Sequence, residues 1–203
     1  MARPKGSGGQ AREFLKEEIK RIDRCLTETL HENRNRALLW LGLGSGMRIV
    51  EMTALLIRDV APHKKVQDFI RLEKHSTKSG KSRTVHISRQ TKQCLENYLK
   101  QRYPIGIENS DLDDPLFLSQ ARRKEPLHPR SAIRMFSQMC QVAGISGAST
   151  HSMRRTHANA LRRRGIDLKI IQEQLGHASL ATTERYFFVD PLEKAKAIAD
   201  LRF

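Results

Sequence analysis

Apolar residues recur at intervals of three and four along much of this chain, which is the spacing of amphipathic helices. Residues 10–31 show it clearly and predict one helix. Its apolar positions are Leu15, Ile19, Ile22, Leu26 and Leu30. Residues 36–43 predict a second, more uniformly apolar helix, and helical spacing resumes over residues 48–55 after Gly44-Ser45-Gly46. Arg48 is therefore expected just past a corner between two helices.

A different pattern occupies residues 66–88, where two short apolar runs flank a turn rich in Lys, Ser and Gly. This pattern predicts a β-hairpin with its tip at residues 77–81. Helical spacing returns over residues 90–102, 130–142, 152–164 and 167–175. A last helix is expected over residues 191–201, because Pro191 suits a first helical turn. The predicted fold class is mainly α with a small antiparallel β-hairpin, an α+β domain.

Length and charge narrow the class of protein. The 203 residues are enough for one domain with its own core, so we predict a flexible basic leader over residues 1–9 and a single domain over residues 10–203. Lys and Arg outnumber Asp and Glu by 37 to 22, which gives a formal charge of +15 and favours a nucleic acid as partner. The 38% of hydrophobic residues indicates a folded binder rather than a disordered tail.

The cysteines and the apolar runs exclude two further classes. Cys25, Cys94 and Cys140 are widely spaced and odd in number, so they predict reduced core thiols rather than a zinc site or a disulfide scaffold. The longest apolar run, over residues 37–47, is too short to cross a bilayer. We therefore expect a cytosolic protein that associates with the nucleoid.

A tyrosine downstream of arginines and histidines suggests chemistry on a phosphodiester. Tyr186 follows the triplet Leu175-Gly176-His177 by nine residues, and Arg154 follows His151 by three, one helical turn away. Attack on a phosphodiester gathers negative charge on the equatorial oxygens, and a guanidinium can hold two such oxygens at once. A histidine near its unperturbed pKa can move a proton at neutral pH.

Four separate motifs and a tyrosine, in one order, resemble the catalytic domain of the tyrosine recombinases, the family that includes the phage integrases. The resemblance runs from about residue 36 to residue 189. Its elements are Gly46-Met47-Arg48-Ile49-Val50-Glu51, Thr77-Lys78-Ser79-Gly80, His151-Ser152-Met153-Arg154, Leu175-Gly176-His177 and Tyr186.

By this resemblance Tyr186 is the nucleophile, which forms a 3′-phosphotyrosyl bond and releases a 5′ hydroxyl. The covalent intermediate keeps the phosphodiester energy, so neither ATP, a cofactor nor a metal is required. Arg48, Arg154 and His177 would stabilise the pentavalent transition state.

The resemblance also assigns proton transfer and orientation. Lys78 would be the general acid for the leaving 5′ oxygen, with Lys81 of the same hairpin as the alternative. His151 would assist proton transfer at the tyrosine or orient the phosphate. Glu51 is expected to orient Arg48 through a salt bridge rather than to transfer protons.

The chain departs from the family pattern in two ways. Arg155 stands where the family often has a histidine. Most relatives also carry a separate amino-terminal DNA-clamping domain, and residues 10–31 are too few to form one. The chain is thus expected to be a minimal recombinase, similar in length to those that invert fimbrial promoter segments, or an excised catalytic domain.

The resemblance implies double-stranded DNA as substrate, a homotetramer on paired sites and accessory DNA-bending proteins. The helix over residues 191–201 would pack into a neighbouring subunit or back onto its own domain. The reaction would be integration, excision, inversion or dimer resolution. Two alternatives share the sequence features, namely relaxation of DNA by a type IB topoisomerase and binding by a catalytically silent regulator.

Overall fold

The computed structural model of the chain describes residues 11–73, 82–119, 125–177 and 199. The predicted leader, the hairpin tip at residues 77–81 and all but residue 199 of the helix expected over residues 191–201 lie outside these ranges. The described part is mainly helical with one two-stranded antiparallel sheet, which confirms the predicted fold class.

Most helices begin and end within two residues of the predicted bounds. The described elements are α1 (Lys16–Cys25), η1 (Leu26–Glu28), α2 (Glu32–Ser45), α3 (Ile49–Thr53), α4 (Ile57–Val60), β1 (Phe69–Leu72), β2 (Arg83–His86), α5 (Arg89–Arg102), η3 (Ile107–Asn109), α6 (Pro129–Val142), α7 (Thr150–Arg163) and α8 (Leu168–Leu175). In the hairpin, Phe69 pairs with His86 and Leu72 with Arg83. The short α4 was not predicted, since four residues are too few to show a period.

The predicted helix over residues 10–31 is wrong at both ends. Residues 11–15 are not helical, because the Phe14 N–H donates to the Thr156 hydroxyl at 2.8 Å and Arg12 donates to the Ser146 carbonyl. At the other end α1 passes into η1 and a turn. Leu15 and Leu30, which were expected on the buried face, are 64% and 82% exposed.

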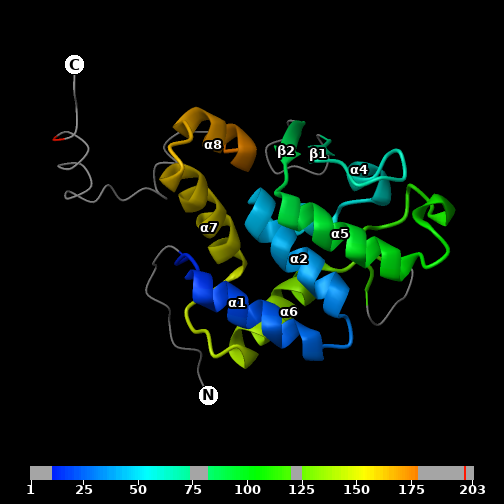
Figure 1. Cartoon of the computed structure of the whole chain (residues 1–203), viewed down its shortest axis with the longest axis horizontal. Helices are drawn as coiled ribbons and strands as arrows, with labels where there is room; N and C mark the ends of the chain where they lie inside the picture. Colours follow the sequence, from blue (N-terminus) through cyan, green and yellow to red (C-terminus); the bar gives the residue numbers. More distant parts are fainter. Residues whose placement is uncertain (1–10, 74–81, 120–124, 178–198, 200–203) are drawn as a thin grey trace.

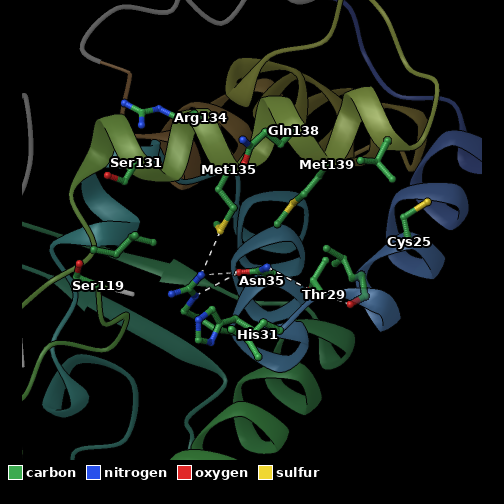
Figure 2. Close-up of a pocket in the computed structure, with 15 residues that line it drawn as sticks. Cys25, Thr29, His31, Asn35, Ser119, Ser131, Arg134, Met135, Gln138 and Met139 are labelled. Atoms are coloured by element: carbon green, nitrogen blue, oxygen red, sulfur yellow. Dashed lines mark hydrogen bonds between the residues drawn. The ribbon is translucent and has the colours of Figure 1, made fainter. Parts of the chain in front are cut away.

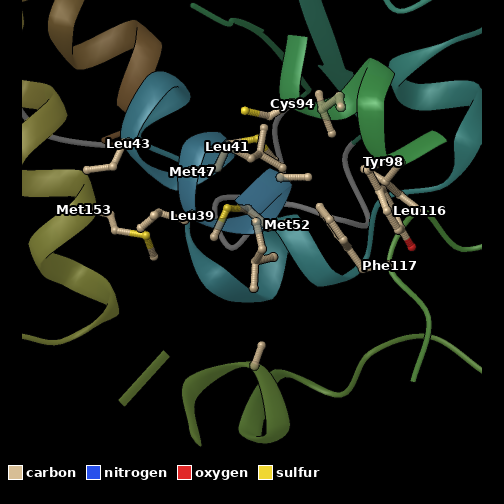
Figure 3. Packing of buried hydrophobic residues seen from close by; sticks show 14 of the residues in the cluster. Leu39, Leu41, Leu43, Met47, Met52, Cys94, Tyr98, Leu116, Phe117 and Met153 are labelled. Atoms are coloured by element: carbon tan, nitrogen blue, oxygen red, sulfur yellow. The ribbon is translucent and has the colours of Figure 1, made fainter. Parts of the chain in front are cut away.

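Helix α2 lies in the middle of the molecule, between α5 on one side and α7 on the other (Figure 1). Its apolar residues are buried on every side, as expected of a helix that crosses a core. Figure 3 shows Leu39, Leu41 and Leu43 of α2 near Met153 on α7, with Tyr98 and Phe117 on the opposite side of the core. The Tyr98 and Phe117 rings stack with centroids 5.7 Å apart.

Two glycines let the neighbouring helices approach α2 closely. A Cβ at Gly42 would lie 2.6 Å from the sulfur of Met153, and a Cβ at Gly44 would lie 2.0 Å from the Thr91 hydroxyl. Thr91 donates that hydroxyl to the Trp40 carbonyl at 2.7 Å, which ties α5 to the backbone of α2. The carboxyl end of α2 is therefore held by side chains on two faces.

All three cysteines are free thiols, as predicted. Cys94 and Cys140 are buried, and Cys25 is half-buried. Burial raises the pKa of the Cys140 thiol to about 11, so this group stays protonated at neutral pH.

Candidate active site

The corner after α2 carries the first candidate residue. The helix ends at Gly46, which has a φ of 68° and donates its N–H to the Gly42 carbonyl. Arg48 then adopts an extended conformation and precedes α3. Its N–H donates to a Glu51 carboxylate oxygen at 2.8 Å, which satisfies the first turn of α3. The Arg48 side chain is one-quarter exposed and thus accessible at the surface of the corner.

Glu51 of α3 is completely buried, and its carboxylate joins β2 to the corner before α3. Arg83 of β2 donates to both of its oxygens at 3.0 Å, and Nη1 of Arg48 donates to Oε1 at 3.1 Å. Burial alone would raise the pKa of Glu51, but the hydrogen bonds and charge of Arg83, with Arg48, hold that pKa below its usual value. Glu51 is therefore an ionised anchor for two arginines.

Arg154 on α7 is only 2% exposed and bridges two backbone segments. Its Nη1 donates to the Gly46 carbonyl and its Nη2 to the Leu175 carbonyl, each at 2.6 Å. The side chain thereby holds the end of α2 against the end of α8. A planar guanidinium suits this task, since its two nitrogens reach separate acceptors in fixed directions.

His177 follows the left-handed residue Gly176, which ends α8. Its backbone is held by Gln172, whose carbonyl accepts from the His177 N–H and whose side-chain amide donates to the His177 carbonyl. The residue is 7% exposed. Burial first, then the charges of Arg154, Arg48 and Arg83, lower the pKa of His177 to about 4. At neutral pH this imidazole is uncharged, so it would act on a phosphate as a hydrogen-bond donor.

His151 stands in the first turn of α7 with an exposed side chain. Partial burial, followed by the charges of Arg154 and Arg48, lowers the pKa of His151 below its ordinary value. The charges of both arginines lower the pKa of both histidines. Arg154 holds the Gly46 and Leu175 carbonyls, each two residues before Arg48 or His177, and His151 lies one turn before Arg154 on α7. The structure thus brings Arg48, His151, Arg154 and His177 to one corner, where Glu51 pairs with Arg48.

Sequence reasoning missed three residues that support this group. Arg83 pairs with Glu51, and it lies so close to Gly176 that a Cβ there would be 2.7 Å from the guanidinium carbon. The side-chain amide of Gln174 donates to the Ser45 and His86 carbonyls and accepts from the His86 N–H, linking α8 to α2 and β2. The alternation of polar and apolar residues gives no signal for such contacts, because each depends on the tertiary structure.

The third missed residue is His157, one turn after Arg154 on α7. Its Nδ1 lies 2.9 Å from the Leu43 carbonyl, so this nitrogen carries the proton. Burial lowers the pKa of His157 to about 4, and its Nε2 is buried without a hydrogen-bond partner among the described residues. Arg154 and His157 therefore hold the Gly46 and Leu43 carbonyls, one helical turn apart at the end of α2.

The remaining candidates, Lys78, Lys81 and Tyr186, lie outside the described residues. Within the described ranges, no group of three or more His, Cys, Asp or Glu side chains is arranged to hold a metal ion. None of the described helices is long and apolar enough to span a membrane.

This fold is the one found in the catalytic domains of tyrosine recombinases. The sequence matches the phage integrase family over residues 12–193. The chain belongs to this family, as the motifs indicated.

Individual proteins similar to this chain are recombinases. The tyrosine recombinase XerA of Pyrococcus furiosus is 33% identical over 175 residues, which are 85% of this chain and 56% of the relative. A crystal structure of XerA recombinase matches with a TM-score of 0.74 and 27% identity, covering 96% of this chain and 68% of that one. A XerH site-specific recombinase bound to its difH substrate matches with a TM-score of 0.70 and 24% identity, covering 98% and 57%. The chain thus spans a little over half the length of the curated relatives it matches.

Proposed function

We propose that this protein is a site-specific DNA recombinase, which cuts and rejoins double-stranded DNA through a 3′-phosphotyrosyl intermediate on Tyr186. The observation that carries the proposal is the gathering of Arg48, His151, Arg154 and His177 at one corner of a strongly basic chain. Membership of the phage integrase family supports it. So does the likeness to tyrosine recombinases such as XerA.

The proposed reaction exchanges one phosphodiester for another. The Tyr186 oxygen bonds to phosphorus while the bond from phosphorus to the 5′ oxygen breaks. Lys78, or Lys81 in its place, gives a proton to the departing oxygen, and the tyrosine proton passes to His151 or to solvent. A 5′ hydroxyl from the partner duplex then reverses these steps and frees the tyrosine. No redox or hydrolytic step is needed.

The described residues are suited to the charge that develops. Arg48 is accessible and held by a buried carboxylate, so its guanidinium is fixed in direction before DNA binds. Neutral His177 would donate a hydrogen bond to a phosphate oxygen. Arg154 adds positive charge from within the protein while its carbonyl contacts keep Arg48 and His177 in register. Preorganised charge of this kind favours the transition state because little rearrangement is required.

The proposal extends to assembly and location. Recombination joins two duplexes, so we propose a homotetramer on paired sites, assisted by accessory DNA-bending proteins and located with the nucleoid. The +15 charge predicts that binding weakens steeply as salt is raised. Integration, excision, inversion and dimer resolution are all compatible with one active site, since they differ in how the sites are placed on DNA.

The test is covalent trapping on genomic DNA from the source organism, with the chain as it stands. Wild type should leave protein attached to 3′ ends at discrete sequences, whereas Tyr186→Phe should leave none. Tyr103→Phe is the matched control, because Tyr103 donates its hydroxyl to Asp114 and directly follows the last residue of α5, away from the corner. It should trap DNA like wild type.

Three results would contradict the proposal. Adducts that persist in Tyr186→Phe would assign the nucleophile elsewhere. DNA binding without adducts in the wild type would favour the silent regulator. Adducts without sequence preference, with relaxation of any supercoiled plasmid, would favour a topoisomerase.

A further inference from the structure

The side chain of Gln174 joins three elements next to the candidate active site. Gln174 is half-buried on α8, one residue before the helix ends at Leu175. Its amide nitrogen donates to the Ser45 carbonyl at the end of α2, at 3.0 Å, and to the His86 carbonyl at the end of β2, at 2.7 Å. Its amide oxygen accepts from the His86 N–H at 3.1 Å. Both donors of this amide and its oxygen thus bind backbone groups.

Gln174 occupies the position that a further strand would take beside β2. The Ile87 N–H donates to the Asp68 carbonyl, so the adjacent pair of Phe69 and His86 does not exchange hydrogen bonds. The N–H and carbonyl of His86 therefore point away from β1, toward the open edge of the sheet. In the part of the chain that the structure describes, this sheet has two strands. Gln174 binds both backbone groups at its open edge and so attaches β2 to α8.

Helix α2, to which Gln174 also binds, is held at both ends. Near its start, Arg34 donates to Asn35 Oδ1 at 3.1 and 3.2 Å and to the Met135 sulfur of α6 at 3.5 Å, beside a cavity between α2 and α6 (Figure 2). At its end, the Ser45 carbonyl accepts from Gln174. A helix held in this way is a fixed support, so the contacts of Gln174 set the position of β2 against the rest of the domain.

Strand β2 follows directly after the lysines proposed as general acid. It begins at Arg83, two residues after Lys81 and five after Lys78. Arg83 attaches the start of β2 to Glu51, and Gln174 attaches its last residue to α8 and α2. Two anchors at the ends of a four-residue strand fix the direction of its axis. Loss of one anchor would let the strand tilt, and the chain would then leave β2 in a different direction.

We propose that Gln174 is a positioning residue for protonation of the leaving 5′ oxygen, which acts by holding β2, and through it the general-acid lysine, at a fixed position relative to Arg48 and His177. This role rests on the proposed function, because it concerns one step of the proposed cleavage. A displacement of about 1 Å in a reacting group can slow a reaction by about a hundredfold, and proton donation contributes about 10²–10⁴-fold. A small shift of the lysine should therefore slow strand cleavage measurably.

The test is single-turnover cleavage of a duplex that carries a site recovered by covalent trapping with the wild type. One form of the duplex has the ordinary scissile phosphodiester, and the other has sulfur in place of the bridging 5′ oxygen. When the tyrosine attacks the sulfur form, the bond from phosphorus to sulfur breaks and a thiolate leaves. The thiolate needs no proton, because thiols are far more acidic than alcohols. The ratio of the two cleavage rates therefore reports on the general acid.

Three variants of α8 separate protonation from other effects. Gln174→Met keeps the length of the side chain and removes its three hydrogen bonds, so it should cleave the ordinary duplex about tenfold more slowly and the sulfur duplex within about twofold of wild type. The Gln172 amide donates to the His177 carbonyl at 3.0 Å, so any loss in Gln172→Met should be equal on both duplexes. Glu173→Gln, at an exposed position, is the matched control and should cleave both as wild type does.

A conservative variant and hydrogen exchange keep the effect apart from misfolding. In Gln174→Lys the ammonium can donate to both carbonyls but cannot accept from the His86 N–H, so its ratio of rates should lie between those of wild type and Gln174→Met. In Gln174→Met the His86 N–H should exchange with solvent faster than in wild type. The N–H groups of Leu39 and Leu41, in the middle of α2, should stay as protected as in wild type.

Three outcomes would overturn this role of Gln174. The first is cleavage of the ordinary duplex by Gln174→Met at the wild-type rate. The second is an equal loss on both duplexes, which would assign Gln174 to general support of the corner. The third is a ratio that rises as much in Gln172→Met as in Gln174→Met. Absence of cleavage by the wild type would overturn the proposed function and this role together, a result that differs from the other three.

Discussion

Removing Arg83 should destabilise the protein through the carboxylate that it leaves behind. Glu51 is completely buried, and Arg83, whose side chain is 11% exposed, donates to both of its oxygens. In Arg83→Met the carboxylate keeps only its contacts with Arg48. Breaking one partner of a buried ion pair typically lowers the free energy of unfolding by about 3–5 kcal/mol. We expect a loss of that size at pH 7, measured by urea unfolding.

The loss of stability in Arg83→Met should depend on pH through the ionisation of Glu51. In wild type the pKa of Glu51 is lowered in the folded state, so its contribution to stability is present above the unfolded value of 4.5 and lost as pH falls below it. In Arg83→Met the burial of Glu51 is no longer offset by the bidentate pair, so the folded state takes up a proton more readily. The stability gap between wild type and variant should therefore narrow from pH 7 towards pH 4.

A double-mutant cycle tests the cause. Glu51→Gln in the Arg83→Met background removes the buried charge and should restore most of the lost stability. Arg71→Met, on the neighbouring strand with an exposed side chain, should change the free energy of unfolding by less than about 0.5 kcal/mol. The reasoning is refuted if Arg83→Met lies within about 1 kcal/mol of wild type, or if Glu51→Gln leaves its effect unchanged.

Three further outcomes follow from the corner and its supports. Gly46→Ala should lower the free energy of unfolding by about 1–3 kcal/mol and reduce DNA adducts, because residue 46 has a φ of 68° and a Cβ there would lie 2.7 Å from Leu175. A urea midpoint equal to that of wild type would contradict this. Arg154→Lys should reduce adduct formation about tenfold or more, because one ammonium cannot reach both carbonyls; equal trapping rates would refute the bridge. The folded pKa of His157 is about 4 against 6.5 unfolded, so stability should fall as pH drops from 6.5 to 4, by up to about 1.4 kcal/mol per unit. His157→Phe should reduce that slope but leave the contribution of His177, whose folded pKa is also about 4, as urea midpoints at several pH values will show.

Local sequence signals could predict the elements whose ends depend on local chemistry. The corner at residue 46 follows from a glycine that must adopt a left-handed conformation, and α5 begins after Ser88, whose hydroxyl accepts from the Thr91 N–H. The helix expected over residues 10–31 failed because its first residues are bound by Ser146 and Thr156. Those partners are more than a hundred residues away in the chain, so no local period could reveal them.

The candidate site was predictable in its residues more than in their arrangement. Motif spacing singled out Arg154 as a phosphate-binding group, yet its guanidinium also donates to the backbone carbonyls of Gly46 and Leu175. The part that Arg83 plays was not predictable, because it depends on how β2 packs against α3 and α8. Spacing identifies side chains that meet on one helix, whereas contacts between elements require the packed structure.

The glycines of α2 also bear on how the protein can change shape. Because Gly42 and Gly44 leave no space beside Met153 and Thr91, α2 cannot slide or rotate without first separating α5 or α7. Its amide hydrogens should therefore exchange with solvent only when the whole domain opens, and more slowly than those of α1. We therefore expect any conformational change of the protein to act on the parts that approach this corner from outside, while the corner itself stays unchanged.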